Sequence, residues 1–256
     1  EQFDLRVETG LDYALGPRDT VGVAANVSLR RFANSAAGLA DSTTYGGRLF
    51  WSRALGPVSS GGLSFSGLRF VSEDDEGGIE TRGYSLSLTA QYARELTPRL
   101  DLDASLGARY TLQNEEIVLL PGLVATRRNS SVGAVGNLGL DYALRRTRIA
   151  LALSQDVRPD ISGALENVTL VDLRLARDLT QRTQLSLAAR YRLEGEVGGE
   201  NSALSQAVRA GPRLALRMTR DWRAELAYDF RLTEDDGVAV GHLLSLRLSR
   251  SFDLLR

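Results

Sequence analysis

Arginine and acidic residues recur at every second position in several segments of the second half of the chain. All 31 basic residues are arginines, whose guanidinium group stays charged and presents a rigid fork of hydrogen-bond donors. Arginines at this spacing would either attract anions and order water in a channel, or pair with carboxylates and stiffen a wall. Both interpretations stay open at this point. Together with three residues nearer the middle of the chain, the candidate residues are Asp101, Asp103, Arg109, Asp172, Arg174, Arg190, Arg192, Arg209, Arg213, Arg217, Arg223, Glu225, Asp229, Arg231 and Arg247.

The rest of the composition excludes several other chemistries. The 256 residues contain no cysteine, which excludes disulfides, thiolate nucleophiles and cysteine-bound metals, and a single histidine, which excludes a histidine-rich metal site. The net charge of −1 lacks the basic excess of a general nucleic-acid binder. His242 and Ser245 fall on opposite faces if their segment alternates. We therefore expect no cofactor, no metal, no nucleic-acid partner and no enzymatic activity.

The segments that carry these residues alternate apolar and polar side chains with period two, which is typical of β-strands with two different faces. Between residues 100 and 112, the even positions hold Leu, Ala and Tyr, and the odd positions hold Asp, Ser, Gly, Arg and Thr. Pro212 predicts a local kink in its strand, and the glycine pairs at 46–47 and 61–62 permit a bulge. We predict 13 strands, at residues 3–15, 20–32, 43–55, 61–72, 81–95, 100–113, 130–144, 148–157, 166–179, 184–195, 204–218, 222–233 and 239–252.

Short turns and longer polar connections alternate along the chain. Short turns such as 16–19 follow the odd-numbered strands, and longer stretches such as 33–42 follow the even-numbered ones. This predicts an all-β, antiparallel up-and-down meander, and a sheet of that size loses its edges by closing into a barrel. A barrel of about 12–14 strands is too wide for side chains to fill. We therefore expect a transmembrane β-barrel with a polar, water-filled interior and an apolar exterior that faces lipid.

Aromatic residues lie on the apolar faces near both ends of the strands. The ten residues from Leu100 to Tyr110 span about 33 Å of strand, or about 25 Å once the strand is tilted, which is the height of a lipid-facing band. The alternative is that aromatic residues simply favour strands. The candidate membrane-girdle residues are Tyr13, Tyr92, Tyr142, Tyr110, Tyr191, Trp222, Tyr228 and Phe230.

These features and the last strand, at residues 241–252, resemble those of bacterial outer-membrane β-barrels. The last strand alternates and ends on the aromatic Phe252, although four residues follow it. The resemblance implies that Phe252 is part of the signal read by the barrel assembly machinery. It also implies an integral outer-membrane protein, surrounded by lipid and lipopolysaccharide, with its C-terminus in the periplasm. The subfamily stays open, because porins, translocator barrels and surface lipoprotein assembly modifiers share these features.

Residues 1–256 are expected to form a single outer-membrane barrel domain. A closed antiparallel barrel needs an even number of strands, and the resemblance places the short turns in the periplasm. One more strand before residue 1 satisfies both conditions. We therefore predict 14 strands in the whole protein, with the first strand or an upstream periplasmic domain or partner missing here. Counting residues 118–126 as a separate strand would move the later short turns to the opposite edge, so we expect a loop or a hairpin extension there.

Three classes of function fit such a barrel. The first is a porin-like channel that passes small hydrophilic solutes through a charged, arginine-rich lumen, with residues 114–128 as the best candidate for a constriction loop. The second is the membrane translocator domain of a larger export or surface-assembly protein, which a missing first strand would favour. The third is a closed structural or adhesive barrel, or an outer-membrane enzyme. The absence of a specific motif favours the first class.

Overall fold

The computed structural model describes residues 2–32, 41–74, 79–120, 123–159, 165–196, 204–234 and 237–250. All 13 predicted strands are confirmed, with ends that agree within two residues except where the sixth and seventh strands meet. The strands are β1 (Gln2–Ala14), β2 (Asp19–Phe32), β3 (Asp41–Gly56), β4 (Ser59–Asp74), β5 (Ile79–Thr97), β6 (Leu100–Leu120), β7 (Leu123–Ala143), β8 (Thr147–Pro159), β9 (Leu165–Asp178), β10 (Thr183–Glu196), β11 (Ser205–Arg217), β12 (Trp222–Glu234) and β13 (Val238–Arg250).

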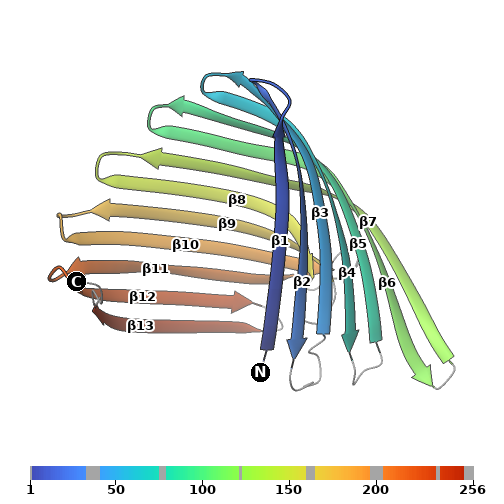
Figure 1. Ribbon diagram of the computed structural model, residues 1–256. Helices are drawn as coiled ribbons and strands as arrows, with labels where there is room; N and C mark the ends of the chain where they lie inside the picture. The colour runs from blue at the N-terminus through green and yellow to red at the C-terminus, as the bar shows by residue number, and fades with distance from the viewer. Residues whose placement is uncertain are drawn as a thin grey trace, which may run out of the picture.

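The strands form one sheet in which each strand pairs antiparallel with the next, in the order β1 to β13. Turns of two to four residues follow the odd-numbered strands up to β11 and lie along one edge of the sheet (Figure 1). The predicted up-and-down meander, with short turns on a single edge, is therefore confirmed. Among the described residues, no helix is long and apolar enough to cross a membrane.

The burial pattern of the central strands is the inverse of that of a water-soluble protein. On β3 to β6, one face buries the ring of Phe70 and, around it, mostly small polar side chains, namely those of Thr44, Ser64, Ser72, Thr81 and Thr111. The alternate positions of the same strands expose leucine, phenylalanine and tyrosine side chains. The polar face is thus the more enclosed, concave side, and the apolar face is the outer one.

Hydroxyl groups on the concave face of β4 and β5 hydrogen-bond to each other across the strands. The Oγ atom of Ser64 lies 2.8 Å from Thr89 Oγ1 and accepts a bond of 3.2 Å from the side-chain amide of Gln91. Ser66 and Ser87 are joined in the same way at 2.6 Å. These bonds satisfy polar groups within the wall, which is what a polar interior behind an apolar exterior requires.

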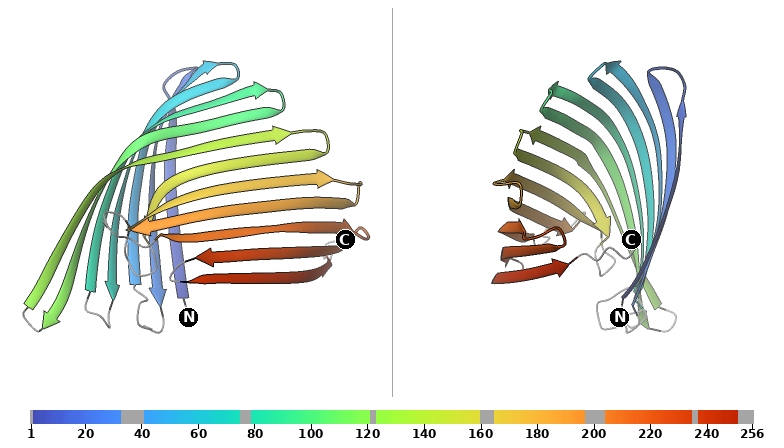
Figure 2. Two further views of the ribbon diagram at one scale, coloured as in Figure 1. Left: turned by 180° about the vertical axis from the view of Figure 1, so that it is seen from behind. Right: turned by 60° about the vertical axis from the view of Figure 1, so that its left-hand side comes forward.

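The sheet is strongly twisted and divides into two wings. β1 to β7 form the first wing, and the strands of β8 to β13 cross them at a steep angle in the second (Figures 1 and 2). The wings join where β7 and β8 pair, and this pairing covers only Gly136–Ala143 and Arg148–Gln155. Beyond Gln155, the β8–β9 hairpin leaves β7. Because Val157 on β8 is 8% exposed, the departing end is enclosed by other parts of the protein.

The β6–β7 hairpin is longer than the alternation predicted. Its ladder continues from Asn114 opposite Arg128 to Val118 opposite Val124, so the described residues 118–120 and 123–126 lie in a hairpin extension and form no separate strand. The extended hairpin projects beyond the neighbouring strands (Figure 1). The expectation of a constriction loop at 114–128 is wrong, because the main-chain pairing keeps the described part of this segment in the wall.

Two sequence signals for local irregularity have different outcomes. The ladder between β11 and β12 lacks partners for Gly211 and Pro212, but the register is the same on both sides, so the pairing is interrupted at the proline without a bulge, and the kink stays a prediction. A side chain at Gly211 would collide with the carbonyl oxygen of Tyr228, which explains the small residue there. The bulge expected at the glycine pairs of β3 and β4 is not found, because these residues keep an unbroken register. The register instead shifts between Ala54 and Gly56, next to the turn.

Among the described residues, β1 and β13 are the two edges of the sheet, each with one hydrogen-bonded neighbour. In an antiparallel meander of 13 strands, the first and the last run in the same direction and cannot pair antiparallel with each other. One further strand, antiparallel to both, would close the barrel. The fourteenth strand thus stays a prediction.

The two faces can be tested with adjacent leucines of β13. Leu244 shares its face with the apolar residues of β12, and Leu243 lies on the concave face, while both are more than half exposed. We expect Leu244→Arg to lower the free energy of unfolding in lipid vesicles by about 2–4 kcal/mol, because it places a charge in the hydrocarbon. Leu243→Arg, at the same depth, is the matched control and should change it by less than about 1 kcal/mol. Urea titration of the folded, heat-modifiable protein measures both, and an equal cost for the two variants would contradict the assignment of the faces.

Candidate pore-lining site

Cross-strand register brings several of the predicted arginines into a row across the second wing. Asp172 on β9 lies opposite Arg190 on β10, which lies opposite Arg209 on β11, which lies opposite Arg231 on β12. Alternation places the four side chains on the concave face. Like charges directly opposite each other destabilise a sheet, so three adjacent arginines need carboxylates close by.

Three carboxylates meet this need, and each of them lies between two arginines. Asp172, Glu225 and Asp229 are these shared carboxylates. The nitrogen–oxygen distances are 3.1 Å for Arg190–Asp172, 3.9 Å for Arg174–Asp172, 2.6 Å for Arg209–Asp229, 3.9 Å for Arg231–Asp229, 3.2 Å for Arg213–Glu225 and 3.9 Å for Arg223–Glu225.

The sharing leaves the concave face of the second wing positive. Six arginines share three carboxylates, so three positive charges remain in excess. No ion pair joins Arg217 or Arg247 to any described carboxylate, whereas Arg192 pairs one to one with Glu194. The six arginine side chains are 49–67% exposed and the three carboxylates 22–24%. A solute that approaches this face therefore meets guanidinium groups first.

The shared pairs surround a groove on the concave side of β9 to β12. Its volume is about 420 Å³, and Arg174, Arg190, Arg209 and Arg213 line it together with two of the three shared carboxylates. Exposed ion pairs of this kind contribute little to stability, about 0–1 kcal/mol each. Their main effect is to hold the guanidinium groups at fixed positions along the groove.

The predicted acidic residues of β6 lie away from the arginine row, in the first wing. Asp103 accepts a hydrogen bond of 2.9 Å from the side-chain amide of Asn137 on β7. Asp101 lies directly opposite Asp141 on the same strand pair. The structure therefore does not bring Asp101 and Asp103 together with the arginines of β9 to β12.

Arg109 differs from the other predicted residues because it is buried, at 3% exposure. Its Nε donates to Thr111 Oγ1 at 3.2 Å, and its Nη2 donates to Asn167 Oδ1 on β9 at 2.6 Å. Gly133 on β7 leaves room for the guanidinium, since a Cβ atom there would lie 2.9 Å from Nη2. Nη1 is buried without a hydrogen-bond partner among the described residues. Arg109 thus fastens the end of the β8–β9 hairpin to the inner side of β6, and it lines no open surface.

Asn167 was not foreseen from the sequence, because alternation assigns it to the apolar face of β9. It lies 58 residues from its partner Arg109. The contact forms only because the hairpin end leaves β7 and turns inside the first wing. No local pattern in the sequence reports that turn.

The outward face carries the predicted girdle residues. Tyr13, Tyr92, Tyr110, Tyr142 and Tyr228 are exposed there, although their contact with lipid stays a prediction. Their neighbours Tyr191, Trp222 and Phe230 lie on the same face and are half-buried. Phe252 lies outside the described residues.

Two pairs of polar side chains meet on the outward face. The hydroxyl of Tyr228 lies 2.7 Å from His242 Nδ1, and Tyr191 donates to the side chain of Gln206 at 3.1 Å. Ser245 instead bonds weakly to the backbone oxygen of Ala227, at 3.5 Å. His242 and Ser245 thus have different partners, as expected for residues on opposite faces.

Comparisons with known proteins identify the fold. No protein-family model and no curated protein matches the chain. Among solved structures, the copper transporter OprC is similar with a TM-score of 0.59 and 12% identity, over 90% of this chain and 48% of OprC. The alcaligin outer-membrane receptor FauA from Bordetella pertussis gives 0.55 and 11%, over 99% and 58%. The pyoverdine outer-membrane receptor FpvA from Pseudomonas aeruginosa PAO1 gives 0.55 and 12%, over 98% and 48%.

The chain thus has the fold of a bacterial outer-membrane β-barrel protein. The expected resemblance is confirmed at this level, and the subfamily stays open. The chain spans about half the length of the structures that it matches. The apolar outward face agrees with a wall embedded in the outer membrane.

The fastening role of Arg109 predicts the effect of Asn167→Ala. This change leaves a second buried guanidinium nitrogen without a partner, and we expect it to lower the free energy of unfolding by about 1.5–3 kcal/mol. The double variant Arg109→Met/Asn167→Leu, which removes the charge as well, should be more stable than Asn167→Ala alone. Asn137→Ala is the control, because it removes only a hydrogen bond from the side-chain amide of Asn137 to the exposed carboxylate of Asp103. We expect it to lower the free energy of unfolding by less than about 1 kcal/mol. Equal urea midpoints for Asn167→Ala and Asn137→Ala would contradict the fastening role.

Proposed function

We propose that the chain forms the wall of an outer-membrane channel that passes small hydrophilic solutes and prefers anions. The observation that carries this proposal is the excess of exposed arginines over recessed carboxylates on the concave face of β9 to β12. The hydroxyl-rich concave face of β4 and β5 supports a wet interior on the opposite wing. We propose no catalytic role, because the residues that would carry one lie on different faces.

The geometry supports passage more than tight binding. Conduction requires sites that attract a solute and also release it. Arg190 and Arg209 keep part of their hydrogen-bonding capacity engaged with Asp172 and Asp229, which limits how strongly they hold a passing anion. The excess charge still raises the local concentration of anions along the groove.

The orientation and the surroundings of the barrel belong to the same proposal. Outer-membrane barrels carry short turns on the periplasmic side, so we place the short-turn edge and the C-terminus there. Lipid and lipopolysaccharide would surround the apolar face. The barrel assembly machinery would insert the chain and read the segment around Phe252.

A second candidate is the membrane domain of a larger export or surface-assembly protein. The edges of β1 and β13 favour it, because in hydrocarbon unpaired main-chain groups need a partner, so more polypeptide has to complete the wall. An upstream periplasmic domain or partner would then open a barrel that is closed on its own. Both candidates share the wall and differ in whether the isolated barrel conducts.

Single-channel recording in planar bilayers separates these candidates. We expect steady, salt-scaled conductance with anion preference from the full-length protein. The triple variant Arg209→Gln/Arg213→Gln/Arg231→Gln should lower the anion-to-cation permeability ratio by about threefold or more, since it removes the three positive charges by which the six arginines exceed the three shared carboxylates. Arg69→Gln is the matched control, because Arg69 lies on the outer face over the ring of Tyr84, 5.7 Å from its centroid.

Two outcomes would overturn the channel. Electrical silence from a folded, heat-modifiable protein would favour the partner-gated translocator or a closed barrel. An unchanged permeability ratio in the triple variant would show that the arginines stiffen the wall without acting on solutes.

A further inference from the structure

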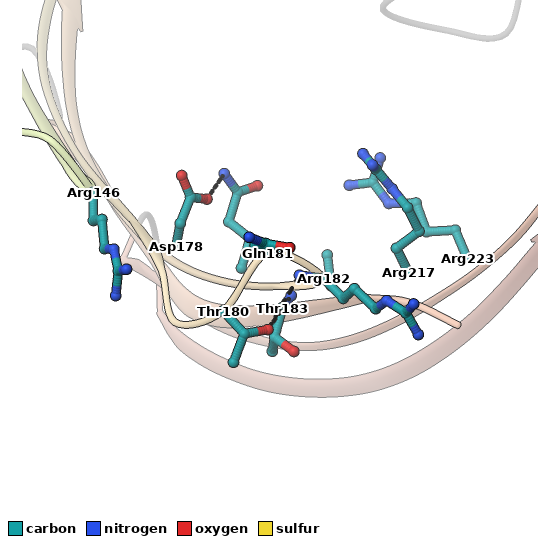
Figure 3. A pocket seen from close by; sticks show the side chains of 10 residues that line it. Arg146, Asp178, Thr180, Gln181, Arg182, Thr183, Arg217 and Arg223 are labelled. Atoms are coloured by element: carbon teal, nitrogen blue, oxygen red, sulfur yellow. Dashed lines mark hydrogen bonds between the residues drawn. The ribbon is translucent and has the colours of Figure 1, made fainter. Parts of the chain in front are cut away.

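A second hollow lies at the short-turn edge of the second wing, below the arginine row. Its volume is about 450 Å³, and its lining comes from the β7–β8 turn, the β9–β10 turn and the facing ends of β11 and β12. Four arginines and one carboxylate contribute to it, namely Arg146, Arg182, Arg217, Arg223 and Asp178. Figure 3 shows the guanidinium groups of Arg217 and Arg223 extending from neighbouring strands on the same side of the sheet as Asp178.

Arg217 and Arg223 are a directly opposed cross-strand pair. Such a pair of like charges is unfavourable unless an opposite charge compensates it. The carboxylate of Glu225 lies 3.9 Å from Arg223 but 3.2 Å from Arg213, so its shorter contact is with Arg213, deeper in the wall. Arg217 forms no ion pair with a described carboxylate. Arg223 thus shares Glu225 with Arg213, whereas Arg217 has no such carboxylate, so the pair carries one positive charge without compensation among the described residues.

Three other polar side chains of the hollow, those of Asp178, Thr180 and Gln184, are already engaged. Asp178 accepts a hydrogen bond of 3.1 Å from Gln184, the residue opposite it on β10. The hydroxyl of Thr180 accepts from the backbone N–H groups of Arg182 and Thr183 and so stabilises the turn. On the side of the sheet where Asp178 lies, the donors that remain for a ligand are the guanidinium groups of Arg217 and Arg223 (Figure 3).

We propose that Arg217 and Arg223 bind a doubly charged tetrahedral oxyanion of the phosphate class at the short-turn mouth of the barrel. Two guanidinium forks can each donate two hydrogen bonds to such an anion, and its charge would relieve the repulsion between them. Arg146 and Arg182 on the adjoining turns add to the positive potential without forming part of the pair. The role of this site as the first station of a permeating anion rests on the proposed channel, whereas the binding itself does not.

Binding of inorganic phosphate to the full-length protein, folded in zwitterionic detergent, tests this site. Line broadening of the phosphate 31P resonance reports the affinity without any need for conduction. We expect Arg217→Gln/Arg223→Gln to weaken phosphate binding about tenfold or more, and Arg217→Lys to have an intermediate effect, since it keeps the charge but loses the fork. Arg69→Gln is the control, because Arg69 lies on the outer face over the ring of Tyr84, away from both hollows.

Competition separates the two sources of such an anion. Displacement of the bound phosphate by nanodiscs that contain phosphatidic acid, but not by phosphatidylcholine nanodiscs, would assign the site to a lipid headgroup at the rim. Displacement by soluble phosphate esters alone would assign it to free anions. Unchanged binding in the double variant, or chloride competing as well as phosphate at equal concentration, would overturn the proposal.

The two proposals fail separately. Phosphate binding lost on Arg217→Gln/Arg223→Gln, in a protein that is electrically silent, would keep the site and remove the channel. Anion-selective conductance without phosphate broadening would keep the channel and remove the site.

Discussion

In a hydrocarbon environment every backbone N–H and C=O group must find its partner within the protein, and the rest of this structure depends on that constraint. Between neighbouring strands it is met by the ladder that runs from β1 to β13, in which side chains point alternately to the two faces, and the edges at β1 and β13 still need a partner. Since the ladder satisfies the backbone, the outer face is free to be apolar. The polar side chains then gather on the concave side, where Ser64 and Thr89 bond to each other across neighbouring strands.

The same alternation concentrates charge, because every arginine placed inside by one strand lies opposite a residue placed inside by the next. Arg190, Arg209 and Arg231 thereby become neighbours, which is costly without carboxylates. Sharing each carboxylate between two arginines removes part of the repulsion and still leaves the surface positive. A wall with one carboxylate for each arginine would be electrically neutral, whereas the shared arrangement keeps three positive charges in excess.

Alternation was sufficient to predict all 13 strands, since a slip of one residue would exchange the faces of a whole strand. Alternation did not predict the length of the β6–β7 hairpin or the burial of Arg109, because both depend on how the sheet curves. Leu120 and Leu123 are the last paired residues of the β6–β7 hairpin, where the regular two-residue pattern had already ended in the sequence. Arg109 was assigned to an open lumen because the pattern gives the face of a side chain but not what lies over that face. Its burial follows from the parting of β7 and β8 and from Asn167, 58 residues away, and no local signal encodes either.

The position of Glu225 relates the arginine row to the hollow at the mouth. Its carboxylate is recessed, at 22% exposure, and lies 3.2 Å from Arg213 and 3.9 Å from Arg223. The contact with Arg213 partly neutralises that guanidinium and so weakens its attraction for an anion. The contact with Arg223 is longer, and Arg217 beside it is the one of these arginines that has no described carboxylate at ion-pair distance. Arg217 lies at the short-turn edge. An anion bound there would supply the opposite charge that Glu225 supplies to Arg213 and Arg223, which is why the proposed anion site lies at the mouth and not within the wall.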